Sequence, residues 1–221
     1  MSSYNYVFFD LDGTISDSAP GIISSLQYAL NEVGVETPEE QELMKLVGPP
    51  LMESLTGYFG MSRQTADKAL SHFRKYYEEK GILENTMYEG IAELIRTLKA
   101  AGRAVVLATS KPEPFAREII SRYGIDAEFD FIAGSCMDET RTKKAEVIAY
   151  ALEAIGLSDP SKAVMVGDRS YDVIGAAENG MSCIGVLYGY GSCEELESAG
   201  AKYIAATAAE VAQIVLNLSA T

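Results

Sequence analysis

Tyr6-Val7-Phe8-Phe9 is a short apolar and aromatic run, and it stops at Asp10-Leu11-Asp12-Gly13-Thr14. An apolar run without polar alternation is typical of a strand that is buried on both faces of a parallel sheet. Asp and Gly favour turns, so we expect this strand to end where the acidic residues begin. The sequence therefore predicts a buried strand with two carboxylates at its carboxyl end.

The rest of the chain changes its periodicity twice. From Gly21 to about residue 85 the apolar residues have helical spacing, and from residue 86 onward strands and helices alternate. Alternating strands and helices imply right-handed βαβ crossovers and a parallel sheet that helices cover on both faces. We therefore expect an α/β core formed by residues 1–15 and 86–221, with an α-helical cap domain inserted at 16–85. The later core strands are predicted at Ala104–Ala108, Phe129–Ala133, Ala163–Val166 and Cys183–Leu187, with one more in the tail.

Composition restricts the partners and the compartment. The formal net charge of −14 provides no overall cationic surface to neutralise the phosphates of a nucleic-acid polymer. The three cysteines form no C-x-x-C pair and are odd in number, which favours a reducing compartment over a disulfide framework. No apolar run approaches the ~18–20 residues that a membrane span needs. We expect a cytoplasmic protein, a monomer or weak homodimer, that binds neither nucleic acid polymers nor membranes.

Polar residues stop several of the predicted strands. In open α/β sheets ligands bind beyond the carboxyl ends of the strands, so these positions are the candidate site. The second strand stops at Thr109-Ser110-Lys111, and the fourth stops at Gly167-Asp168, with Asp172 one helical turn later. The pair Lys143-Lys144 begins the helix after the third strand. Packing alone does not explain carboxylates, a hydroxyl and an ammonium at one end of a sheet, so a functional site is predicted there.

This set of motifs resembles that of the haloacid-dehalogenase superfamily. The similar segments are Asp10–Thr14, Thr109, Lys143-Lys144 and Gly167–Asp172, and the resemblance covers essentially the whole chain. It implies a Rossmann-like α/β core with sheet order 5-4-1-2-3 and a small helical cap. The stretch Gly185–Ser192 is similar both to phosphoglycolate phosphatase-like and to 5′-nucleotidase-like members.

The resemblance also implies a chemistry, which is Mg²⁺-dependent hydrolysis of a small phosphate ester through an aspartyl-phosphate. Asp10 is the implied nucleophile, and Asp12 would protonate the leaving oxygen and then deprotonate the attacking water. Mg²⁺ prefers oxygen ligands, and the family pattern supplies the side chains of Asp10 and Asp168 with the backbone carbonyl of Asp12. Asp172 would support the metal through its water shell or by orienting a lysine.

Other residues are expected to contact the phosphate ester. Thr109 would offer a hydroxyl to the phosphoryl oxygens, and one lysine would offset their negative charge. Lys144 fits the family spacing better, and Lys143 is the alternative. The further substrate-binding residues that we expect are Gly13, Thr14, Ser110, Lys111 and, in the cap domain, Gly48.

Several alternative functions follow from the same motifs. Dehalogenases and phosphonate hydrolases normally lack the second aspartate, so Asp12 argues against both. A phosphomutase of the β-phosphoglucomutase type keeps both aspartates and remains an alternative. A phospho-accepting switch, such as a receiver domain, and an inactive binding protein are the non-enzymatic alternatives. The motifs leave the substrate open between phosphoglycolate and a nucleoside 5′-monophosphate, because they address only the phosphoryl group.

Overall fold

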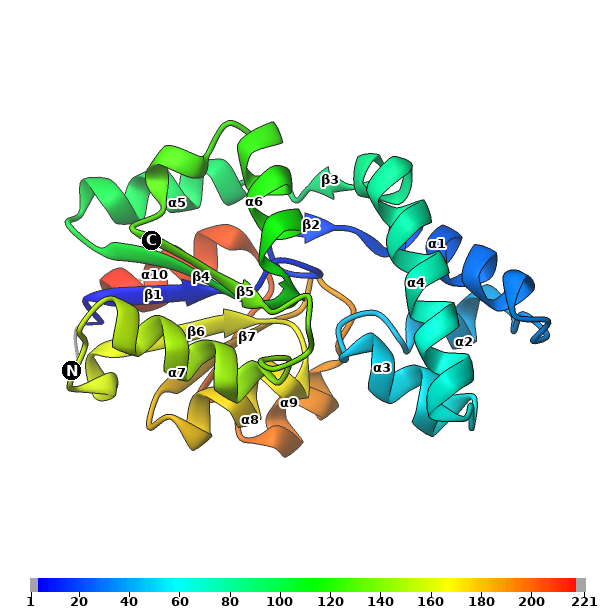
Figure 1. The fold of residues 1–221 in the computed structure, drawn as a ribbon. Helices are drawn as coiled ribbons and strands as arrows, with labels where there is room; N and C mark the ends of the chain where they lie inside the picture. The colour runs from blue at the N-terminus through cyan, green and yellow to red at the C-terminus, as the bar shows by residue number, and fades with distance from the viewer. Residues whose placement is uncertain (1–3, 218–221) are drawn as a thin grey trace. The chain divides into compact units, whose positions relative to one another are not determined.

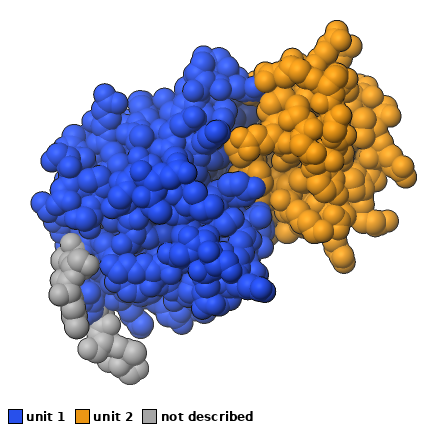
Figure 2. Space-filling model, turned by 90° about the horizontal axis from the view of Figure 1, so that it is seen from below, with its two compact units in different colours: residues 1–16, 87–221 blue, residues 17–86 orange. Residues whose placement is uncertain are grey.

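The computed structural model describes residues 4–217, and the chain divides into two compact units. Unit 1 contains the residues up to Ser16 and from Met87 onward, and unit 2 contains Asp17–Thr86 (Figure 2). These boundaries lie one residue beyond those expected from the change in periodicity. The ends of the expected core, residues 1–3 and 218–221, lie outside the described residues.

Unit 1 is built on a six-stranded parallel sheet in the part of the chain that the structure describes (Figure 1). Counting the core strands along the chain, the expected order 5-4-1-2-3 is confirmed, and a sixth strand, β8, adds to the edge beside β7. From one edge to the other the strands are β5 (Phe131–Ser135), β4 (Ala104–Pro112), β1 (Tyr6–Phe9), β6 (Ala163–Gly167), β7 (Ser182–Val186) and β8 (Tyr203–Ala205).

Helices cover both faces of this sheet, as the alternation of elements predicts. Phe8 of β1 packs on one face with apolar residues of α7, α8 and α9, whereas α5 and α10 pack together on the other (Figure 1). Successive residues of β1 therefore contact different layers, and Val7, Phe8 and Phe9 are all fully buried. The helices of unit 1 are α5 (Ile91–Ala100), α6 (Glu113–Arg122), α7 (Lys144–Ala154), α8 (Ser170–Glu178), α9 (Cys193–Ala199) and α10 (Ala208–Leu216).

Strand β4 continues beyond the residue at which the sequence predicts its end. The expected strand stops at Ala108, but β4 extends through Thr109–Lys111 to Pro112. Its pairing with β5 is irregular between Ala108 and Pro112. Irregular pairing bends a strand and redirects its side chains. The residues between Ala108 and Pro112 therefore leave the regular pairing with β5 and lie at the candidate site.

Unit 2 is mainly helical, as expected from the spacing of its apolar residues. Ile22, Leu26 and Leu30 recur at helical spacing on its first helix and are buried. Ser62 caps the long helix by accepting a hydrogen bond from the amide of Thr65 at 3.2 Å. The helices of unit 2 are α1 (Ala19–Glu32), α2 (Glu40–Met44), α3 (Leu51–Glu53) and α4 (Arg63–Glu79), with a π-turn at Ser54–Tyr58 and a 3₁₀ turn at Gly81–Leu83.

The chain passes between the units through two short strands. β2 (Ser16–Asp17) and β3 (Thr86–Met87) pair as a two-stranded sheet. The sequence predicts no strand between Ser16 and Asn85, and β2 corrects that expectation. Two-residue strands carry no periodicity, so no apolar pattern could have indicated them. None of the helices among residues 4–217 combines the length and the apolar character required to traverse a lipid bilayer.

Candidate active site

The turn after β1 places Asp10 and Asp12 at the carboxyl edge of the sheet. The amide of Asp10 still donates to the carbonyl of Val166 at 3.0 Å, so Asp10 is held in register with β6. Gly13 then adopts a φ of +79°, which disfavours any residue with a side chain. A Cβ at this position would also lie 2.2 Å from Oδ2 of Asp168. Gly13 is therefore a position that lets the first acidic turn approach the carboxylate of Asp168.

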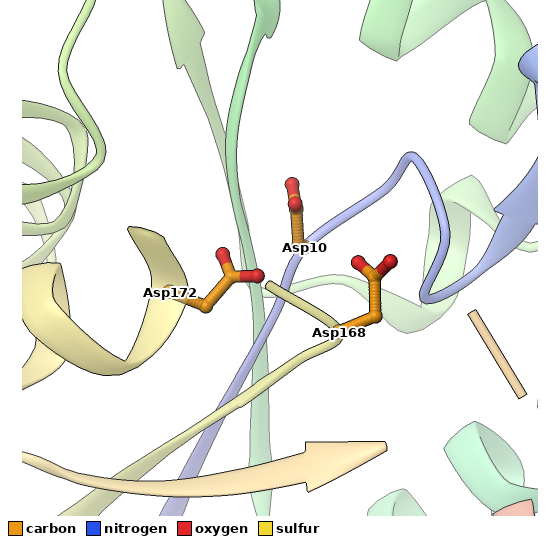
Figure 3. A group of neighbouring side chains, drawn as sticks. All are labelled: Asp10, Asp168 and Asp172. Atoms are coloured by element: carbon orange, nitrogen blue, oxygen red, sulfur yellow. The ribbon is translucent and has the colours of Figure 1, made fainter. Parts of the chain in front are cut away.

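Three carboxylates meet at this edge from three different elements (Figure 3). Asp10 follows β1, Asp168 follows β6, and Asp172 lies in the first turn of α8. One carboxylate oxygen from each lies within 4.8 Å of the others, and all three residues are buried. Residues about 160 positions apart in sequence thus form one cluster because β1 and β6 are neighbouring parallel strands.

Lys144 supplies a positive charge to this cluster. Its Nζ lies 2.7 Å from Oδ1 of Asp10 and 2.9 Å from Oδ1 of Asp172, and it donates to the carbonyl of Ala108 at 3.1 Å. A Cβ on Gly175 of α8 would approach Cγ of Lys144 to 2.9 Å, so this glycine leaves room for the lysine stem. Lys143, the other candidate, is exposed. The structure therefore brings Lys144, and not Lys143, to Asp10.

Lys111 contacts the second aspartate, Asp12. Its Nζ donates to both carboxylate oxygens of Asp12, at 2.8 and 2.9 Å. The backbone amide of Lys111 donates to the hydroxyl of Thr109 at 3.2 Å, and Thr109 is itself buried. The irregular segment of β4 therefore places the hydroxyl of Thr109 and the ammonium of Lys111 at the same edge of the sheet.

Burial and mutual repulsion disfavour the negative charges of the acidic cluster. Burial raises the pKa of Asp10 to about 6, although Lys144 opposes that shift, and repulsion from Asp172 adds to it. Burial raises the pKa of Asp168 to about 8, and repulsion from Asp172 and Asp10 again adds to it. Burial disfavours the charge of Lys144, but the carboxylates of Asp10 and Asp172 outweigh burial and raise its pKa. A cation placed among these carboxylates would therefore favour their ionised forms.

Two loops complete the surroundings of Asp168. The hydroxyl of Thr14 donates to its Oδ1 at 3.2 Å, and the amide of Tyr190 donates to its Oδ2 at 2.8 Å. Asp168 forms no ion pair with any residue in the described part of the chain. Its carboxyl group is thus oriented by two neutral donors and has no salt-bridge partner among the described residues.

The loop after β7 packs directly on Asp168. A Cβ on Gly189 would lie 2.2 Å from the carbonyl oxygen of Gly13 and 2.4 Å from Cβ of Asp168. A Cβ on Gly191 would lie 1.9 Å from the carbonyl oxygen of Asp168. The alternating glycines, one on each side of Tyr190, were the sequence signal for this close approach.

The remaining expected residues lie in different places. Ser110 is half-buried in the irregular segment of β4, beside Thr109 and Lys111. Gly48 belongs to unit 2, where its φ of +108° marks a turn between α2 and α3. The expected roles of both at the substrate stay predictions.

Comparison with known proteins identifies the family. Residues 7–186 match the model of the haloacid dehalogenase-like hydrolases. The chain belongs to this family. The sequence is 39% identical over 212 residues to a 5′-nucleotidase of Pseudomonas aeruginosa, and the match covers 96% of each protein. A phosphoglycolate phosphatase of Vibrio parahaemolyticus is 27% identical, with 95% of each protein covered.

Two further similar proteins are a phosphatase of known structure and a protein named as a kinase. The crystal structure of a predicted phosphatase from Clostridium acetobutylicum is 44% identical, with a TM-score of 0.94 over 98% of this chain and 100% of that one. The tyrosine-protein kinase PtkA of Mycobacterium tuberculosis is 41% identical over 86% of this chain, which spans 65% of PtkA. The protein is an enzyme of the phosphatase class within the haloacid dehalogenase-like hydrolases.

The donor set of the site fits the Mg²⁺ that this family generally uses. Every buried charged residue in the described part of the chain lies at this edge of the sheet. When ionised, the four carboxylates exceed the two ammonium groups by two negative charges, which is the charge of one divalent cation. Carboxylate oxygens are also the protein ligands that Mg²⁺ prefers. The residues of this set are Asp10, Asp12, Asp168 and Asp172, with Lys111 and Lys144.

Replacing Gly189 with Ala should weaken Mg²⁺ binding at the candidate site without replacing any of the carboxylates that could hold the ion. The new Cβ cannot fit beside Asp168, so the loop or the carboxylate must move, and misplacing such an orienting group typically costs about 10- to 100-fold in metal affinity. The measurement is the Mg²⁺ concentration for half-maximal phosphatase activity. Gly57→Ala is the matched control, because no atom lies within 4 Å of its added Cβ. An unchanged Mg²⁺ requirement in Gly189→Ala would contradict the role given to this loop.

Proposed function

We propose that the protein is a Mg²⁺-dependent phosphomonoester hydrolase that acts through an aspartyl-phosphate on Asp10. The observation that carries this proposal is the burial of four carboxylates and two lysines at one edge of the sheet, with Asp10 at the end of its central strand. Unpaired buried charges are costly, so this arrangement is better suited to binding a cation and a phosphate than to stabilising the fold.

In the first proposed step, a carboxylate oxygen of Asp10 attacks the phosphorus of the ester. A bond forms between that oxygen and phosphorus while the bond from phosphorus to the leaving oxygen breaks. Asp12, in its protonated form, gives its proton to the leaving oxygen, so that an alcohol departs. The ammonium of Lys144 lies 2.7 Å from Asp10, where it can offset negative charge as the phosphoryl group transfers.

In the second proposed step, water attacks the phosphorus of the aspartyl-phosphate. Asp12 takes a proton from this water, inorganic phosphate leaves, and the carboxylate of Asp10 is restored. Asp12 thereby returns to the protonated form with which the cycle began. Bound Mg²⁺ would be held by Asp10, Asp168 and the backbone carbonyl of Asp12, and it supplies positive charge that lowers the repulsion between the phosphate ester and the carboxylates.

Two substrate classes are supported by the named relatives. The P. aeruginosa relative is called a 5′-nucleotidase, and the more distant Vibrio relative a phosphoglycolate phosphatase. We propose a small phosphorylated metabolite of one of these classes. The greater identity, 39% against 27%, places nucleoside 5′-monophosphates first in the order of testing.

The test is phosphate release from a panel of metabolite phosphates, measured with Mg²⁺ and after its removal by EDTA. The panel contains nucleoside 5′-monophosphates, phosphoglycolate and sugar phosphates, with Asp10→Asn protein beside the wild type. We expect release that requires both Mg²⁺ and Asp10, and we expect saturating Mg²⁺ to raise Tm, since a ligand at 100 times its Kd stabilises by about 2.7 kcal/mol. Full activity in EDTA would contradict the metal requirement.

The same panel separates hydrolysis from transfer to another acceptor. A phosphomutase would return the phosphoryl group to a sugar and release little free phosphate. The Mycobacterium relative is named a tyrosine-protein kinase, which transfers a phosphoryl group to tyrosine. One set of assays therefore contains ATP and a tyrosine peptide. Phosphopeptide formed faster than free phosphate in those assays would replace hydrolysis as the proposed activity.

A further inference from the structure

We propose that Lys111 is a positioning residue that holds Asp12 for proton transfer to the leaving group, and that it does not bind the substrate's phosphate. This inference rests on the proposed function, because it assigns the partner of the proposed general acid. From the sequence, Lys111 is expected among the substrate-binding residues, and the inference gives it a different role.

The contact between Lys111 and Asp12 is buried and involves both carboxylate oxygens. The Nζ–O distances are 2.8 and 2.9 Å, and the side chains are 5% and 11% exposed. Exposed lysine–carboxylate pairs are mobile and contribute little, but a desolvated pair with two short contacts restricts the rotation of the carboxylate. Lys111 thus restricts the direction in which Asp12 presents its oxygens.

The segments that carry Lys111 and Asp12 are held in place by backbone contacts. Lys111 lies in the irregular segment of β4, and its amide donates to the hydroxyl of Thr109 at 3.2 Å. Asp12 lies in the turn after β1, and β1 pairs with β4. The salt bridge therefore connects the ends of two adjacent strands at the edge where Asp10 lies. Displacement of a catalytic acid by about 1 Å can lower the reaction rate about 100-fold.

A different lysine already serves the nucleophile. Lys144 lies 2.7 Å from Oδ1 of Asp10, whereas the ammonium of Lys111 donates to Asp12 and its backbone amide donates to the hydroxyl of Thr109. Lys144 is thus paired with Asp10 and Asp172, and Lys111 is paired with Asp12. Because one pair lies at the nucleophile and the other at the acid, removing each lysine should affect a different part of the first step.

The test compares two esters that differ in their need for an acid. p-Nitrophenolate is a stable anion that leaves without a proton, whereas the alkoxide of an alkyl phosphate needs one. We expect Lys111→Met to lower kcat/KM about 100-fold for the best alkyl substrate of the panel, but less than about fivefold for p-nitrophenyl phosphate. Equal losses for both esters, or a rise in KM for both, would assign Lys111 to phosphate binding and overturn the inference.

A double-mutant cycle tests the pairing directly. If Lys111 acts through Asp12, then Lys111→Met should have little further effect on alkyl-ester hydrolysis in protein that already carries Asp12→Asn. If Lys111 acts on the substrate, the two losses should multiply. Multiplying losses would therefore contradict the inference independently of the two-ester comparison.

Controls separate this inference from folding and from the proposed function. Lys162→Met removes an exposed lysine of unit 1 and should leave both kcat/KM values unchanged. If Lys111→Met lowers Tm strongly, Lys111→Gln keeps one donor for Asp12 and should show a smaller but equally leaving-group-dependent loss. Wild-type protein that hydrolyses neither ester would reject the proposed function itself, and the inference with it.

Discussion

Asp10→Asn protein should release phosphate at least about 10⁴-fold more slowly than wild type, because removal of a nucleophile abolishes the covalent route. Asn has nearly the same shape as Asp, but its amide cannot form an acyl-phosphate. The fold should persist, because Asp10 is at the end of β1 and the hydrogen bond from its backbone amide to the carbonyl of Val166 is unaffected. The measurement is phosphate release from the best panel substrate at saturating Mg²⁺.

The direction of the change in Tm caused by Asp10→Asn can be predicted. A carboxyl whose pKa is raised to about 6 in the folded protein contributes less stability as pH rises through that value. A neutral side chain avoids this loss, so the metal-free variant should melt at or above the wild-type Tm at pH 8. A low Tm would show that lost activity reflects unfolding, and the rate comparison would then use Asp10→Ala.

The covalent intermediate gives a second readout for the same variant. Wild-type protein quenched in acid during turnover should carry one phosphoryl group that hydroxylamine removes, as expected for an acyl-phosphate. Asp10→Asn protein should carry none. Turnover by the variant within about tenfold of wild type, or an unchanged phosphoryl label, would reject Asp10 as the nucleophile.

Lys144→Met should have the second-largest effect, a loss of about 2–4 kcal/mol of transition-state stabilisation, or roughly 10²- to 10³-fold in kcat. The ammonium of Lys144 contacts both Asp10 and Asp172, so it lies where charge develops on the transferred group. In contrast to Lys111→Met, the loss should be similar for aryl and alkyl esters. Lys143→Met is the matched control, because it removes the same kind of side chain one residue earlier, at an exposed position.

Folding must be checked in this variant, because removing one partner of a buried ion pair typically costs about 3–5 kcal/mol. The assay is therefore run at saturating Mg²⁺, with Tm measured in the same buffer. If Lys144→Met does not fold, Lys144→Gln offers a neutral donor of similar length. A loss in Lys143→Met together with normal activity in Lys144→Met would reverse the assignment of the two lysines.

The fold was largely predictable because its signals are local. The apolar run before Asp10 and the alternation of strands and helices indicate a parallel sheet, and the family resemblance implies its order, which the structure confirms. The extension of β4 to Pro112 was not predicted, because Thr109–Lys111 is polar and strand patterns are recognised by buried apolar residues. The edge strand β8 follows β7, but its place in the sheet depends on pairing that one strand alone does not reveal.

The candidate site was predictable as a set of residue types but not as a set of contacts. Asp10, Asp168 and Asp172 could be expected together because they follow neighbouring parallel strands. The sequence could not assign Lys111 to Asp12, because that contact depends on a local irregularity in β4. The amide of Tyr190 was missed as well, since a backbone donor is present at almost every residue and its partner depends on the path of the loop.

By itself the sequence determined the layered α/β class, the acidic end of the first strand and the chemical types available at the carboxyl edge. These properties follow from residue identity and spacing over a few positions. Only the tertiary structure decided that Lys144 rather than Lys143 meets Asp10, and that Lys111 is paired with Asp12. The reason is that a rotation of a helix by one residue, or a turn of one strand segment, moves an ammonium group by several ångströms, and packing across distant parts of the chain sets both.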